Sequence, residues 1–97
     1  MYGRHPSASY TNGLAIGSIL FDRFRDIDRA GAVYRMAIER EPSRYEAYHE
    51  LAAALQSAGR TDIAIDLIVE YRDEYGDLDT AVEDEQILRN ALGIGEN

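Results

Sequence analysis

The amino-acid sequence predicts an all-α protein in which about five helices form antiparallel pairs that stack as a short α-solenoid. The first observation is an internal repeat of 34 residues, which is the length of one helix–turn–helix unit. The second is the regular placement of helix-ending residues between the apolar stretches, as at Pro42 and Gly59. The two observations agree in phase, so each unit should supply two helices.

The repeat preserves the size or apolar character of most of the paired residues. Residues of the first half recur 34 positions later as the pairs Leu14/Tyr48, Ser18/Ala52, Phe21/Leu55, Ala30/Ala64, Tyr34/Ile68 and Ala37/Tyr71, whereas Pro42/Gly76 differs. Helices approach closely where small side chains face each other, so the alanines should mark the helix crossings. Tyr34, Tyr48, Leu55 and Ile68 should fill the space around them.

The elements follow in chain order. Residues 1–10 show no periodicity and predict a flexible tail, and residues 93–97 predict a fraying end. Between them we expect five helices at about Thr11–Arg25, Asp28–Glu41, Ser43–Ser57, Asp62–Tyr75 and Asp79–Leu92.

Capping residues account for the expected helix boundaries. Ser43, followed three residues later by Glu46, has the form of a capping box. Gly59 suits a left-handed C-cap. Thr61 and Asp62 can accept the free amide protons at the start of the next helix. Each apolar stretch therefore has a predicted start and end.

The pattern resembles the tetratricopeptide repeat family. The matching residues are Tyr48-x-x-Leu51-Ala52-x-x-Leu55, Ala64-x-x-x-Ile68 and Ala30-x-x-x-Tyr34-x-x-Ala37 closing on Pro42. The resemblance implies a right-handed solenoid of about two and a half repeats, with residues 11–44 as the first, 45–78 as the second and 79–92 as a capping helix. It also implies a protein-binding adaptor or scaffold whose concave face is lined by the first helix of each repeat.

Charge and composition narrow the classes of partner. The formal net charge of −8 opposes binding to a phosphate backbone, so we expect no nucleic acid partner. The longest apolar run, 14–21, is interrupted by Gly17 and Ser18 and is far short of a membrane span, so we expect no membrane association and a cytoplasmic location. The chain has no cysteine, which excludes disulfides and thiolate metal sites.

All ten basic residues are arginine, and two explanations stay open for this composition. One is the codon usage of a GC-rich genome. The other is adaptation to a salt-rich cytoplasm, in which the carboxylate excess keeps the protein hydrated while salt screens its self-repulsion.

Candidate catalytic and metal-binding patterns are incomplete. His49-Glu50 begins a zinc-binding His-Glu-x-x-His motif, but Ala53 stands where the second histidine belongs. Glu46 and His49 have the i, i+3 spacing of di-iron bundles, yet the chain offers no second pair. We therefore expect no enzyme activity and no cofactor. A small helical metal protein or enzyme using Glu46 and His49 is the alternative.

The family resemblance implies a peptide-binding groove on the first helix of each unit. Its expected residues are Asn12, Ala15, Ile19, Asp22 and Arg23, then Glu46, His49, Ala53, Gln56 and Ser57, then Thr80, Glu83, Ile87, Asn90 and Ala91. Ile19, Ala53 and Ile87 would form an apolar strip with acidic flanks. This combination favours a protein or peptide partner that is apolar with basic flanks.

The first helix also predicts an association surface. Apolar residues cover most of its circumference, and Ile16, Leu20 and Phe24 lie beyond the stripe that packs within the repeat. Contiguous exposed apolar side chains of this kind usually mark an interface, so self-association as a homo-oligomer is expected. A purely structural homo-oligomer with an unused groove is the further alternative.

Overall fold

The computed structural model describes residues 6–93 and contains five α-helices in this range, with no strand among these residues. The helices are α1 (Pro6–Phe24), α2 (Ile27–Arg40), α3 (Glu46–Ser57), α4 (Thr61–Tyr75) and α5 (Asp79–Leu92). The all-α class and the number of helices are confirmed for the described part of the chain. The predicted flexible tails at residues 1–5 and 94–97 lie outside the described residues.

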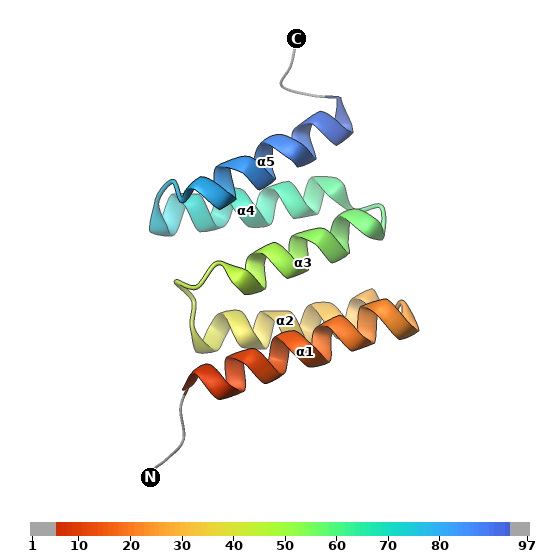
Figure 1. Cartoon of the computed structure of the whole chain (residues 1–97). Coiled ribbons are helices and arrows are strands. Elements are labelled where there is room, and N and C mark those ends of the chain that lie inside the picture. The colour runs from red at the N-terminus through yellow and green to blue at the C-terminus, as the bar shows by residue number, and fades with distance from the viewer. Residues whose placement is uncertain (1–5, 94–97) are drawn as a thin grey trace.

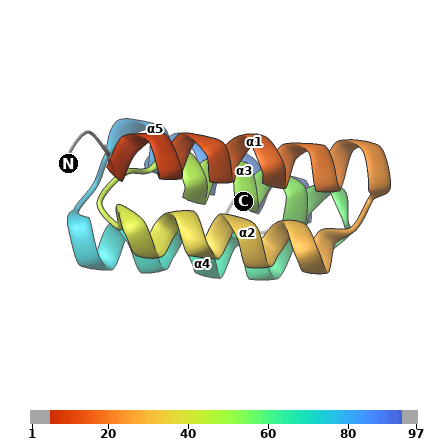
Figure 2. The same ribbon diagram turned by 90° about the horizontal axis from the view of Figure 1, so that it is seen from below.

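The helices stack in chain order, with α1 and α2 at one end and α5 at the other (Figure 1). Successive helices run antiparallel, and each packs against its neighbour in sequence. A view along the stack shows two layers, with α1, α3 and α5 in one and α2 and α4 in the other (Figure 2). Within the first layer α3 contacts both α1 and α5, but the more extensive contacts are those between helices that follow each other in sequence.

The core is built from the residues that the repeat singled out. The predicted small side chains Ala30 and Ala64 are completely buried, as crossing points of closely packed helices require. Tyr34 and Ile68 fill the space beside them and are also almost fully buried. Gly17 allows Tyr34 to approach α1, because a Cβ atom at residue 17 would lie 2.6 Å from Cε1 of that ring.

The prediction that residues 6–10 belong to a flexible tail is wrong. Helix α1 begins at Pro6, and Tyr10 is completely buried in a small cluster with Ala37 and Ala47. The Tyr10 hydroxyl oxygen accepts a hydrogen bond of 2.8 Å from the amide of Ala47 in the first turn of α3. This contact between distant parts of the chain lengthens the helix beyond the repeat pattern.

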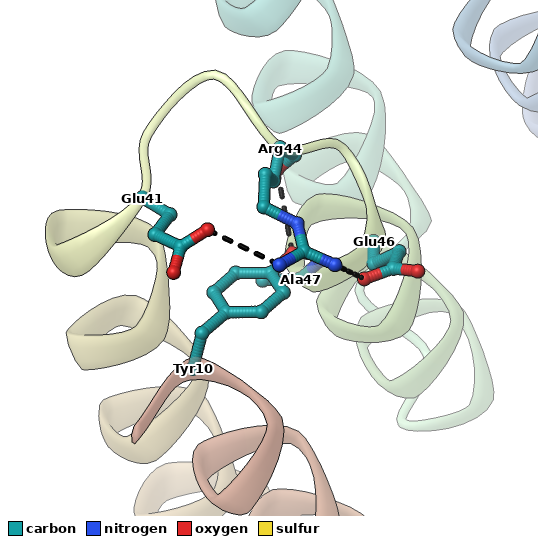
Figure 3. A network of polar contacts seen from close by, with 5 residues as sticks. All are labelled: Tyr10, Glu41, Arg44, Glu46 and Ala47. Carbon is teal, nitrogen blue, oxygen red and sulfur yellow. Dashed lines mark hydrogen bonds and ion pairs between the residues drawn. The ribbon is translucent and has the colours of Figure 1, made fainter. Parts of the chain in front are cut away.

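The predicted capping box at Ser43 is also wrong, because α3 begins only at Glu46. Arg44 bonds back to the Glu41 carbonyl in a turn, and the Ser43 carbonyl accepts a hydrogen bond of 2.7 Å from the Tyr71 hydroxyl. The Tyr10 hydroxyl therefore performs the capping that was expected of a serine (Figure 3).

The start of α4 differs from the prediction, whereas the end of α3 agrees with it. Helix α4 begins at Thr61, and no side chain caps it, so the predicted capping by Thr61 and Asp62 is wrong. Gly59 adopts φ +81°. The Arg60 amide donates to the Leu55 carbonyl across this residue, which is the bond of a glycine-closed helix end.

Candidate functional site

The exposed side of α3 is hollowed on both flanks. A cleft of about 180 Å³, here called the α3–α5 cleft, lies between these two helices. It is lined by His49, Ala52, Ala53, Gln56, Asp84, Ile87 and Leu88. Ala52 and Leu88 are buried and form its floor, whereas Ile87 is 57% exposed at its edge. The cleft thus combines an apolar interior with an acidic residue.

Two further hollows adjoin the α3–α5 cleft. A cleft of about 140 Å³ between α1 and α3, here called the α1–α3 cleft, includes Asp22 and Ser57 and shares Ala53 with the α3–α5 cleft. A third hollow of about 450 Å³ at the start of α3 includes Glu46, Leu78 and Thr80 and shares His49 with the α3–α5 cleft. The shared residues make the three hollows one continuous surface across the layer of α1, α3 and α5.

A polar cluster joins α3 to α5 at the centre of this surface. Asp84 Oδ2 lies 2.6 Å from His49 Nδ1 and accepts a hydrogen bond of 2.6 Å from the Tyr45 hydroxyl. Burial, together with this hydrogen bond to a carboxylate, raises the pKa of Tyr45 and keeps its phenol protonated. The Asp84 side chain is 16% exposed, while that of His49 is 49% exposed and remains accessible from the hollows.

Aromatic rings support the polar cluster from beneath. Tyr45 stacks parallel to Tyr48, and Tyr71 meets both rings edge-on at centroid distances of 5.0 and 4.8 Å. Burial raises the pKa of Tyr48 to about 12. These packed rings fix the first turn of α3 and therefore the position of His49.

A second network anchors the same end of α3 (Figure 3). The Arg44 guanidinium lies 4.4 Å from the centre of the Tyr10 ring and donates hydrogen bonds of 3.1 Å to Glu41 and 2.9 Å to Glu46. Cation–π and ionic contacts of this kind order a long side chain. The positive charge of Arg44, which lines the third hollow, is thereby offset by two carboxylates.

The predicted groove residues divide into two groups. All lie on exposed or half-buried positions of α1, α3 and α5. Those that line the three hollows are Asp22, Glu46, His49, Ala53, Gln56, Ser57, Thr80 and Ile87. Those that line none of these hollows are Asn12, Ala15, Ile19, Arg23, Glu83, Asn90 and Ala91. The surface is therefore centred on α3. Of the predicted residues on α1, only Asp22, near the end of that helix, lines a hollow.

Sequence reasoning missed two important residues of this surface. Asp84 is the acceptor for both His49 and Tyr45, and Glu50 lines two of the hollows. Asp84 and Glu50 are 34 residues apart, so they occupy equivalent positions in the repeat. This equivalence in the repeat was the sequence signal that could have placed both residues on the same surface.

The predicted association surface is only partly exposed. Ile16 and Phe24 are 50% and 69% exposed. Leu20, in contrast, is half-buried and packs against the main core, so its assignment to a free apolar face is wrong. Leu20 turns inward because it lies on the side of α1 that the remaining helices cover.

Glu46 and His49 both line the third hollow, but they have different ionic partners. Glu46 pairs with Arg44, whereas His49 pairs with Asp84. Between residues 6 and 93, no group of three histidine, cysteine, aspartate or glutamate side chains is placed to hold a metal ion. Nor is any helix in this range long and apolar enough to cross a membrane.

Comparison with known proteins finds no matching family model, curated protein or solved structure.

Proposed function

We propose that this chain is a tetratricopeptide-like interaction module that binds an apolar segment with basic flanks across the outer side of α1, α3 and α5. The two-layer stack supports the solenoid interpretation, because the first helices of successive helix pairs lie side by side in one layer. Such a layer offers a surface that is continuous from one pair to the next.

The observation that carries the proposal is the α3–α5 cleft. Its interior is apolar, Ile87 stands exposed at its edge, and Asp84, Glu50 and Glu46 lie in or beside the hollows. An apolar side chain can enter the cleft while neighbouring arginine or lysine side chains meet the carboxylates. The combination favours an extended or helical peptide over a small polar ligand.

The proposal is tested with synthetic peptides that carry a central leucine or phenylalanine. One set has flanking arginines, and the matched set has flanking glutamates. Isothermal titration should show that only the arginine set binds, with an affinity that falls as salt screens the charges. Ile87→Glu should weaken binding by about tenfold or more, because it places a carboxylate at the apolar edge.

Met36→Glu is the matched control. Met36 on α2 is 57% exposed, the same fraction as Ile87, but it belongs to the opposite layer. The control variant should bind the arginine peptides like the original chain. Equal binding of both peptide sets, or equal losses in both variants, would contradict a binding surface on α3 and α5.

A further inference from the structure

We infer that the segment bound by the α3–α5 cleft is the Arg23–Phe24–Arg25 corner of a second copy of this chain. The inference rests on the proposed function and names the partner of that surface. The self-association predicted from α1 then takes the form of a head-to-tail contact between two different surfaces.

The corner has the chemistry that the cleft requires. Phe24 is 69% exposed, more than any other large apolar side chain between residues 8 and 93. Arginines stand on both sides of it, and neither belongs to an ion pair among the described residues. The corner is therefore an apolar side chain with basic flanks.

The acidic residues beside the corner are already engaged within their own chain. Asp22 accepts a hydrogen bond of 3.1 Å from Ser18. Asp26 caps α2 through the amide of Arg29 at 3.0 Å and pairs with its guanidinium. Among the described residues Arg23 has no carboxylate partner, and the Arg25 guanidinium lies 5.2 Å from the centre of the Phe21 ring. Both arginines therefore keep their positive charge at this end of α1, beside the carboxylate of Asp22.

Arg25 occupies a backbone conformation that favours glycine. Its φ is +54°, and the Asp26 amide donates across it to the Leu20 carbonyl, which closes the end of α1. The equivalent position 34 residues later is Gly59, with φ +81°. Glycine adopts this conformation without steric cost, so an arginine at this position lowers stability relative to glycine but places a charged side chain at the corner.

The cleft is sized for one side chain. Its volume of about 180 Å³ is enough for one aromatic ring. Phe24 would rest on Ala52 and Leu88 beside Ile87. Arg23 and Arg25 would then reach the carboxylates of Glu50 on α3 and of Glu83, which stands one helical turn before Ile87.

Charge is distributed unevenly along the stack in a way that favours this pairing. Residues 6–44 contain six arginines and five carboxylates, whereas residues 45–93 contain three arginines and twelve carboxylates. The α1–α2 end of one copy is therefore nearly neutral, so the acidic α3–α5 region of another copy does not repel it as a whole and can attract the arginines of the corner. Association of this kind produces chains or rings of copies.

Sedimentation of the full chain at low salt tests the inference. The mass should rise with concentration, and the association should weaken by about tenfold or more in molar potassium chloride, as the screening length falls from about 30 Å to about 3 Å. Phe24→Glu and Ile87→Glu should each yield monomers, whereas Met36→Glu should associate like the original chain.

Mixing the two monomeric variants distinguishes the head-to-tail contact from other contacts. Phe24→Glu keeps an intact cleft and Ile87→Glu keeps an intact corner, so the mixture should form a 1:1 complex and no larger species. Arg25→Gly should raise the melting temperature while weakening association by about tenfold, which separates loss of docking from loss of folding.

Three results would overturn the inference. One is a chain that stays monomeric up to about 1 mM, the weakest affinity of interest. Another is self-association that Ile87→Glu leaves unchanged, which would indicate a contact between α1 helices instead. The third is a variant mixture that remains monomeric. If the chain does not self-associate but still binds the arginine-flanked peptides, the proposed function stands and the partner is a different protein.

Discussion

Alanine substitutions at two helical glycines, Gly17 and Gly31, should change stability in opposite directions. Both glycines lie inside helices, Gly17 in α1 and Gly31 in α2. A Cβ atom at residue 17 would lie 2.6 Å from Cε1 of Tyr34, closer than side chains tolerate. At residue 31 its nearest neighbour would be Cδ1 of Leu51 at 3.8 Å, an ordinary contact.

The magnitudes follow from helix propensity and packing. Replacing an interior glycine with alanine favours the helix by about 0.8–1 kcal/mol, so Gly31→Ala should stabilise the protein by roughly that amount. At residue 17 the same gain is opposed by overpacking, which costs about 1–3 kcal/mol. Tyr34 is only 2% exposed and cannot swing into solvent. We therefore expect Gly17→Ala to destabilise the protein by about 1 kcal/mol.

Urea denaturation followed by circular dichroism at 222 nm provides the measurement. The two variants should differ by about 2 kcal/mol in the free energy of unfolding, which separates their melting temperatures by roughly 8–16 °C for a domain of this size. A Gly17→Ala protein as stable as Gly31→Ala would show that the Tyr34 ring does not pack on α1, and the described core would be wrong at that point.

Three further predictions concern the polar groups that join the helices. Tyr10→Phe removes the acceptor for the Ala47 amide, so thermal denaturation should show a loss of about 1–3 kcal/mol; a loss below about 0.5 kcal/mol would exclude the capping role. Burial raises the pKa of Tyr34 and of Tyr48 to about 12, so the folded state holds protons that the unfolded state releases above pH 10. Stability should therefore fall as the pH rises from about 10 to 12, and tyrosine absorbance at 295 nm should increase together with unfolding; tyrosines that all titrate near pH 10 in folded protein would refute this. Burial alone would raise the pKa of Glu85, but hydrogen bonds from two arginines outweigh it and lower the pKa below 4.5. The stabilisation by Glu85 is complete above pH 4.5 and is lost as the pH falls through its lowered pKa. Glu85→Gln should therefore be less stable than the original chain at pH 7, and urea titrations at successively lower pH should show the difference shrinking.

The sequence was sufficient for the class of the fold and most helix boundaries. The apolar periodicity and helix-ending residues such as Pro42 and Gly59 reflect interactions between residues close in the chain, which can be read from the sequence. The 34-residue repeat shows most of these patterns in both halves of the chain. Ala30 and Ala64 could be assigned to helix crossings for the same reason, since only small side chains permit close approach.

The candidate surface was only partly predictable. His49, Ala53 and Ile87, which the family resemblance assigned to one groove, all line the α3–α5 cleft. The resemblance could not indicate that Asp84 is the partner of His49, because many carboxylates occupy α5 and only helix packing selects one of them. Exposure alone likewise could not separate Ile19, which lines none of the three hollows, from Ile87.

Predictions of helix capping from neighbouring residues failed where the capping group came from a distant part of the chain. Ser43 and Glu46 have the spacing of a capping box, yet the amide of Ala47 bonds to a phenol 37 residues earlier in the chain. The sequence alone determined the helical period, the repeat and the charge. The tertiary structure decided where α1 begins, which groups cap α3 and which carboxylate meets His49, because these contacts join residues that come together only when the helices pack.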